Sequence, residues 1–355
     1  MIQANKSSEY LIWADALRVL ATVAVVVIHV SANVVFAIGK INPFEWWVGN
    51  ILDSASRWCV PMFVMISGAL LLDPSKNEEI SIFFGKRIKR IIIPLIFWSF
   101  TYFLWLKIRG HEITLRYMVR NLLTGGTYYH LYFLYLIFGL YLITPVLKTY
   151  LQFASSRNIT YFVIICFLFV IVQQFVNFIE SREMFSSLAL TRFIPFIGYY
   201  IAGFHLRKFV IERKHLKSIL VVLFLCIFFI SFGSWLLMKK YGITSRGYYL
   251  HNYMSPPEII MSFCIFFLAI MTYGNGGDTS AVFRKINSKF QRLAPATFGV
   301  YLVHPIALDL LSEYGINGLW KTSIVGIPLT TILTLIACFT VINFMRKVPL
   351  LRLTV

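Results

Sequence analysis

Ten apolar stretches, each of about 20 residues, follow one another along the chain and constrain its fold more than any other feature. They lie at 11–36, 46–72, 84–107, 129–149, 159–179, 191–208, 216–238, 258–274, 294–313 and 323–345. A stretch of this length crosses the hydrocarbon core as a helix, because lipid cannot satisfy unpaired backbone groups. The sequence therefore predicts an all-α fold, a polytopic membrane helix bundle of about ten transmembrane helices. We expect a single domain over 1–355, with no fused soluble domain.

The composition fits a membrane protein and suggests what its basic residues do. Hydrophobic residues make up 58% of the chain and charged residues only 14%, against about a quarter in soluble domains. A net charge of +18 can indicate a nucleic-acid partner, but a polytopic protein needs Lys and Arg to fix its orientation. Loops on the side of the N-terminus carry about 20 basic residues, and loops on the other side about 10. We therefore expect both termini in the cytoplasm and no nucleic-acid partner.

The cysteines and the long loops bear on possible binding sites. All five cysteines lie inside apolar stretches without metal-binding spacing, so we expect buried thiols and no metal. The longest connections on the outer side are 109–128 and 239–257, rich in Tyr and Gly. Long loops tend to carry function, so we expect these two to form an outward substrate mouth.

The first apolar stretch carries Asp15, Arg18 and His29. Arg18 and His29 are eleven residues apart, which places them on one helix face, roughly 16 Å apart along the axis. Asp15 is three residues before Arg18 and can pair with it. Arg18 could simply reach lipid headgroups while His29 bonds a neighbouring helix. Alternatively, ionisable residues inside a membrane helix indicate a functional site.

The second and third stretches add charged pairs. Asp53 and Arg57 share a face with Asn50, and we expect Arg57 at about the depth of His29. The pair is either structural or part of an acceptor-binding wall. Arg87 and Arg90 lie three residues apart at the start of the third stretch. They are either anchors that fix orientation or a fork for phosphates, which guanidinium groups bind bidentately.

Two further histidines lie in or beside apolar stretches. His304 lies in the ninth stretch, three residues after Tyr301 and directly before Pro305. It is either a packed, hydrogen-bonded histidine or part of a site. His130 lies in "YYHLYFLY" (128–135), which resembles an aromatic membrane-interface belt with a possible sugar-stacking role.

Together these residues resemble acyltransferase family 3, the integral-membrane O-acyltransferases that modify cell-surface glycans. The resemblance covers nearly the whole chain and is closest to the branch containing the O-acetyltransferase of enterobacterial common antigen. The motifs that carry it are Arg18-x10-His29, "SRWCVPMFVMISG" (56–68), Arg87-x-x-Arg90, "HLYFLYLIFGLYLITPVL" (130–147) and "FGVYLVHP" (298–305).

The resemblance implies an activity and its location. It implies ten helices in a bacterial plasma (inner) membrane, and a cytosolic acyl-CoA donor, usually acetyl-CoA. The acceptor is then a sugar of a surface or polyprenyl-linked glycan, reached through the membrane lipid or the outer face. By the same resemblance His29 is the catalytic histidine, and Arg18, Arg87 and Arg90 bind the donor. Relatives often have Trp where this chain has Tyr132, which puts a stacking surface there in doubt.

The sequence thus predicts an O-acyltransferase in which His29 acts as a general base or is itself transiently acylated. The predicted site residues are His29, Asp15 and His304 for catalysis, Arg18, Arg87 and Arg90 for the donor, and Asp53, Arg57, His130 and Tyr301 for the substrate. The alternative is a transporter or flippase of a lipid-linked saccharide that binds its cargo without a covalent step. The arginine pair favours the enzyme, because a flippase needs no site for CoA phosphates.

Overall fold

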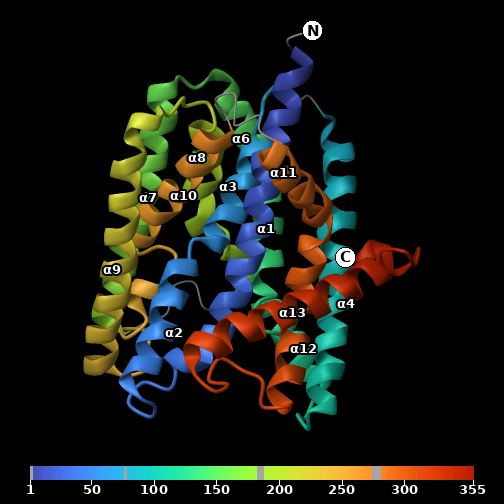
Figure 1. Cartoon of the computed structure of the whole chain (residues 1–355). Coiled ribbons are helices and arrows are strands. Elements are labelled where there is room, and N and C mark those ends of the chain that lie inside the picture. Colours follow the sequence, from blue (N-terminus) through green and yellow to red (C-terminus); the bar gives the residue numbers. More distant parts are fainter. Residues whose placement is uncertain (1–2, 76–77, 182–187, 274–280) are drawn as a thin grey trace.

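The computed structural model describes residues 3–75, 78–181, 188–273 and 281–355, and these form helices without strands (Figure 1). The helices are α1 (Gln3–Val35), α2 (Pro43–Ser56), α3 (Cys59–Leu71), α4 (Ile80–Ile108), α5 (Leu115–Thr124), α6 (Tyr132–Phe153), α7 (Ser156–Glu180), α8 (Ile197–Leu206), α9 (Leu216–Tyr241), α10 (Pro256–Tyr273), α11 (Ala281–Leu293), α12 (Thr297–Glu313) and α13 (Ser323–Met345). Within the described ranges, nine helical segments are long and apolar enough to span a membrane. The predicted polytopic helix bundle is therefore confirmed.

The predicted stretch 191–208 does not form a long helix. The chain there makes two short 3₁₀ turns, η1 (Ala189–Thr191) and η2 (Ile194–Phe196), and then the short helix α8. The segment still joins the two ends of the bundle. Arg192 near its start donates to the carbonyl of Thr124 at the end of α5, and Arg207 at its other end pairs with Asp73 after α3. The helices that follow therefore keep their expected alternating directions.

Glycines hold α8 against α3. A Cβ on Gly68 would collide with the carbonyl oxygen of Tyr200, and one on Gly203 with that of Met65. Only glycine lets the two backbones touch in this way, as small residues do in other membrane helix pairs. The α3–α8 contact is therefore close and fixed.

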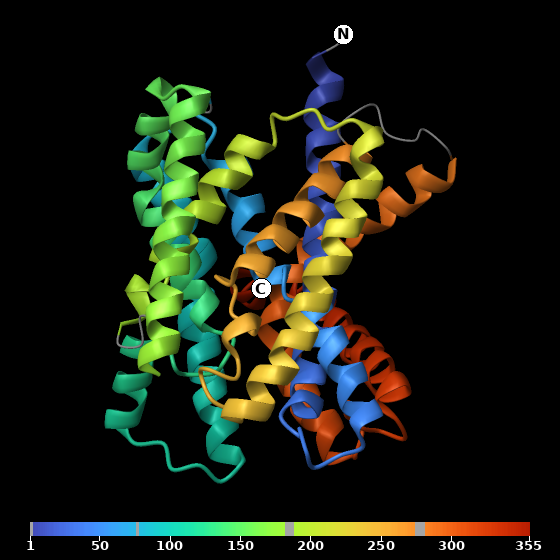
Figure 2. The same cartoon turned by 90° about the vertical axis from the view of Figure 1, so that its left-hand side faces the viewer.

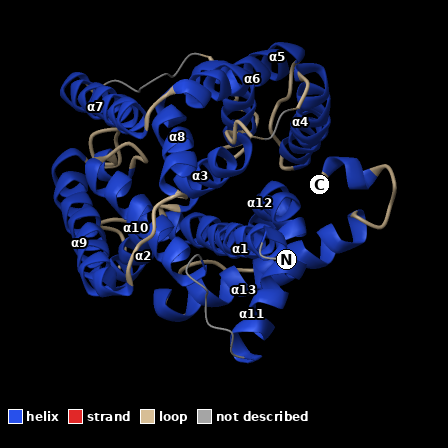
Figure 3. Cartoon of the chain, turned by 90° about the horizontal axis from the view of Figure 1, so that it is seen from above, coloured by secondary structure: helices blue, strands red, loops and turns tan. Residues whose placement is uncertain are grey.

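Helix α1 lies inside the bundle. It packs against α2, α3, α10, α12 and α13, and Figure 3 shows these helices around it. Alanines such as Ala14, Ala21 and Ala24 are buried at its contacts. In α1, 61% of the spanning window is buried, against 22% in α7 and α9, the helices on the side that faces the viewer in Figure 2. Much of α1, with its polar residues, therefore faces protein rather than lipid.

The second predicted helix is broken in two. Arg57 and Trp58 stand between α2 and α3, outside both helices. Pro61 explains the break, because proline lacks an N–H and its ring clashes with the carbonyl four residues earlier, here that of Arg57. The break places the Arg57 side chain inside the bundle, where it can meet groups from other helices.

Candidate active site

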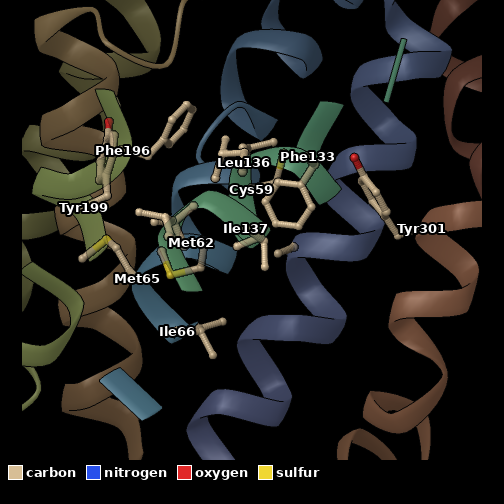
Figure 4. Close-up of a cluster of buried hydrophobic side chains, with 14 of the residues drawn as sticks. Cys59, Met62, Met65, Ile66, Phe133, Leu136, Ile137, Phe196, Tyr199 and Tyr301 are labelled. Atoms are coloured by element: carbon tan, nitrogen blue, oxygen red, sulfur yellow. The ribbon is translucent and has the colours of Figure 1, made fainter. Parts of the chain in front are cut away.

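A cavity of about 370 Å³ extends into the bundle from the side where the spanning part of α1 begins. We call it the arginine cavity, since Arg18, Arg87 and Arg90 line it at one end and Tyr301 lines it as well. Apolar side chains form the wall, and Figure 4 shows several of them beside Tyr301. Its full lining is Asp15, Arg18, Phe63, Ile66, Ser67, Leu70, Leu71, Arg87, Arg90, Ile91, Phe133, Leu134, Ile137, Tyr141, Ala294, Pro295, Thr297, Phe298 and Tyr301.

Positive charge dominates the arginine cavity. The predicted Asp15–Arg18 pair forms, with Arg18 Nη1 2.9 Å from Asp15 Oδ1. Among the described residues, neither Arg87 nor Arg90 forms an ion pair with an acidic side chain. The guanidinium of Arg87 lies over the ring of Phe83, 4.7 Å from its centroid. Three guanidinium groups thus face one carboxylate, and the cavity can accept an anionic group.

Three histidines from three segments meet beyond Tyr301. We call His29, His130 and His304 the histidine cluster. The His29 and His304 rings stack at 5.1 Å between centroids, and the His130 and His304 rings meet edge to face at 5.2 Å. The Tyr129 ring lies 4.7 Å from that of His29. His130 and His304 are fully buried, whereas His29 is partly exposed.

Backbone carbonyls of α12 orient two of these rings. His304 Nδ1 donates to the carbonyl of Tyr301 at 2.7 Å, and His130 Nε2 donates to that of Leu302 at 3.2 Å. The Tyr301 hydroxyl donates in turn to the backbone carbonyl of His130. Tyr301 therefore links the wall of the arginine cavity to the histidine cluster.

The predicted Asp53–Arg57 pair also forms. Arg57 Nε and Nη2 donate to the two oxygens of Asp53 at 2.6 and 3.1 Å, and Nη1 donates to the carbonyl of His251 at 2.8 Å. Asp53 is buried, so the pair is largely shielded from solvent. Arg57 is also close enough to His29 to interact with it electrostatically.

Arg57 borders a second cavity, of about 410 Å³, which we call the tyrosine cavity. The connection between α9 and α10 supplies much of its wall, as expected for the loop 239–257. The other loop, 109–128, contains α5 but contributes no residue to the lining of this cavity. The lining is Arg57, Tyr132, Gln174, Asn177, Phe178, Arg192, Pro195, Phe196, Ser245, Tyr248, Tyr249, His251, Asn252, Tyr253 and Met254.

One predicted site residue lies elsewhere than the sequence suggested. Asp15 is where the sequence predicted it, paired with Arg18 at the arginine end and about 21 Å along α1 from His29. His130 is buried in the histidine cluster rather than placed in an interface belt, because the chain turns inward before α6. Its neighbour Tyr129, 51% exposed, is the more accessible of the two.

Sequence reasoning missed a carboxylate beside this site. Asp309 Oδ2 accepts hydrogen bonds from Trp105 Nε1 at 2.8 Å and from the Tyr128 hydroxyl at 2.6 Å. Tyr128 also packs on Tyr129, with ring centroids 4.9 Å apart. A signal was present, since Asp309 is a charged residue in an apolar stretch, five positions after His304. No group of three or more His, Cys, Asp or Glu side chains in the described part of the chain is arranged to hold a metal ion.

Comparison with known families identifies the chain. The family Acyl_transf_3, described as an acyltransferase domain, matches residues 11–343. No curated protein and no solved structure matches the chain. The matched range contains both cavities and the histidine cluster. The chain therefore belongs to acyltransferase family 3 and is a multi-pass membrane acyltransferase.

Proposed function

We propose that this acyltransferase moves an acyl group, most often acetyl, from cytosolic acyl-CoA to a hydroxyl of a cell-surface or polyprenyl-linked glycan. One observation carries the proposal. The arginine cavity has guanidinium groups near one end, and Tyr301, which lines it, contacts the histidine cluster. A donor with phosphates at one end and a thioester at the other fits such a cavity.

The arginine cavity suits the two parts of acyl-CoA. Arg87 and Arg90, which form no ion pair with an acidic side chain among the described residues, are available for the nucleotide phosphates through charge-assisted hydrogen bonds. The apolar wall formed by residues such as Ile66, Phe133 and Ile137 suits the pantetheine arm. The separation of roughly 16 Å between Arg18 and His29 along α1 is a length that an extended arm can bridge.

His29 is the proposed base. As the sugar oxygen attacks the thioester carbonyl carbon, His29 takes the hydroxyl proton. The C–S bond then breaks, and the imidazolium returns the proton to the CoA thiolate. A transiently acylated His29 would give the same products in two steps.

The tyrosine cavity is the proposed acceptor site. Its tyrosines and amides can stack on and hydrogen-bond a sugar, and Arg57, which lines it, is close enough to His29 for their charges to interact. With the N-terminus in the cytoplasm, this cavity opens toward the outer side of a bacterial inner membrane. We also propose that the chain belongs to the branch of the family that contains the O-acetyltransferase of enterobacterial common antigen.

The test uses purified protein in detergent with acetyl-CoA and a polyprenyl-linked saccharide. We expect release of free CoA together with an O-acetylated saccharide detected by mass spectrometry. The protein is also reconstituted into lipid vesicles. Movement of the saccharide across the vesicle membrane without consumption of acetyl-CoA would instead identify a flippase. A His215→Ala protein, altered at an exposed histidine away from both cavities, serves as the control.

A further inference from the structure

Pro305 leaves one carbonyl of α12 without its helical partner. In an α-helix the N–H of residue 305 would donate to the carbonyl of Tyr301, but proline has no N–H. His304 Nδ1 lies 2.7 Å from this oxygen. A carbonyl oxygen only accepts, so the hydrogen bond requires the proton on Nδ1. The proline therefore removes the competing donor, and the hydrogen bond to this carbonyl fixes the proton of His304 on Nδ1.

The other ring nitrogen of His304, Nε2, is then unprotonated and can accept a hydrogen bond. His304 Nε2 is buried and has no hydrogen-bond partner within the described part of the chain. Buried polar atoms are rarely left unpaired, so such an atom calls for an explanation. The His304 ring stacks on His29, 5.1 Å between centroids, and His29 is partly exposed. A ligand that reaches His29 therefore comes close to this lone pair.

The three histidines of the cluster are not equivalent. His130 Nε2 donates to the carbonyl of Leu302, so its Nδ1 is also an unpaired acceptor. However, the described ring contacts join His130 to His304 and not to His29. His29 makes no hydrogen bond that would fix its tautomer among the described contacts. His304 is thus the one histidine that is both fixed in tautomer and stacked on the proposed base.

We propose that His304 Nε2 accepts a hydrogen bond from a second hydroxyl of the acceptor, next to the hydroxyl that His29 activates. The inference rests on the proposed function and narrows its substrate class to sugars with two adjacent free hydroxyls. His304 holds the neighbouring hydroxyl and so selects which oxygen meets the thioester.

The first experiment reads the tautomer directly. Protein labelled with ¹⁵N-histidine is studied by NMR, and the His304 signals are assigned as those lost in His304→Asn. We expect a protonated Nδ1 and an unprotonated Nε2. A protonated Nε2 in the wild-type protein would overturn the inference, whatever the activity.

The second experiment tests recognition with matched acceptors, cis-1,2-cyclohexanediol and cyclohexanol, each with acetyl-CoA. We expect wild-type protein to acetylate the diol about tenfold faster, the value of one additional hydrogen bond. His304→Asn keeps a donor for the Tyr301 carbonyl but loses Nε2, so its ratio of diol to cyclohexanol rates should fall to about one, whatever its overall rate. Equal rates in the wild type, or a preference that survives in His304→Asn, would overturn the inference. Failure to consume acetyl-CoA with either alcohol or with the polyprenyl-linked saccharide would instead count against the proposed function.

Discussion

The two cavities handle charge in opposite ways. The arginine cavity holds three guanidinium groups and one carboxylate, and Arg87 and Arg90 have no acidic partner among the described residues. In the tyrosine cavity, Arg57 already has a bidentate carboxylate and a backbone carbonyl. The first cavity is therefore prepared to gain negative charge from a ligand. The second has one further cation, Arg192, which donates to the Thr124 carbonyl, and otherwise offers neutral hydrogen-bonding groups. This difference fits the proposed phosphate-bearing donor and sugar acceptor.

The largest effect is expected at the histidine cluster. A general base contributes roughly 10²–10⁴-fold in rate, so His29→Ala should lose nearly all acyl transfer at saturating donor. Binding of acetyl-CoA, measured by calorimetry, should persist because the arginine cavity is unchanged. A variant that keeps more than about a tenth of the wild-type rate would remove His29 from the chemistry, since a base supplies at least ~10².

Removing one partner of the buried pair should break the neutral balance of the tyrosine cavity. Asp53→Ala leaves the Arg57 charge unpaired inside the bundle, which costs about 3–5 kcal/mol of unfolding free energy. Thermal unfolding in detergent measures the loss. The double variant Asp53→Asn with Arg57→Gln is the control and should lose less than Asp53→Ala. Equal stability of Asp53→Ala and wild type would show that the pair is not desolvated in the protein.

Substitutions of arginines in the arginine cavity should change the affinity for the acyl-CoA donor rather than the rate of transfer at saturating donor. Arg87→Ala or Arg90→Ala should weaken acyl-CoA binding by roughly 1.5–3 kcal/mol and raise the KM for acetyl-CoA accordingly. Lysine at either position should rescue only partly, because it lacks the guanidinium fork. The control is Lys89→Ala, in the same basic run but outside the cavity lining.

A second donor sharpens this prediction. Acetyl-pantetheine has the thioester but no nucleotide phosphates, so its KM should be the same in wild type, Arg87→Ala and Arg90→Ala. If the alanine variants keep the wild-type KM for acetyl-CoA, these arginines only fix the orientation of α4.

The smallest effect is expected where Arg207 joins α8 to the end of α3. Partial burial acts to raise the pKa of Asp73, but hydrogen bonds from Ser75 and Arg207 lower it to about 2. The pKa of Asp73 is lower in the folded protein than in the unfolded chain, where it is about 3.9, so its carboxylate stabilises the folded protein above that pH. This stabilisation is lost as the pH falls toward 2. Because Asp73 is partly exposed, we expect about 1 kcal/mol or less. Melting curves of Asp73→Asn should therefore match wild type near pH 2 and lie slightly lower at pH 7.

Local features were predictable from the sequence, whereas contacts between segments far apart in the chain were not. Length and hydropathy identified the long helices, and the short spacings gave the Asp15–Arg18 and Asp53–Arg57 pairs, because both depend on neighbours in the chain. The break at Arg57 was missed although Pro61 signals it. Prolines are ambiguous here, since Pro94 lies within the continuous helix α4.

The histidine cluster illustrates what sequence cannot supply. His29, His130 and His304 come from distant segments, and their contacts depend on how α1, the start of α6 and α12 pack. The segment 191–208 is apolar enough to be taken for a long helix. Pro195 in the second turn is a local signal for its division into two turns and a short helix, whereas the close contact of α8 with α3 has no local signal.

The glycine contact between α3 and α8 has a consequence for the membrane as an electrical barrier. Residues of α3 line the arginine cavity, and residues just before α8 line the tyrosine cavity, so this pair stands between two openings on opposite sides. A water column joining them would let protons and ions run down the transmembrane potential. Backbones in direct contact at Gly68 and Gly203 leave no space for water between α3 and α8. For the two ligands proposed to enter from opposite compartments, this contact helps the bilayer to remain an insulator.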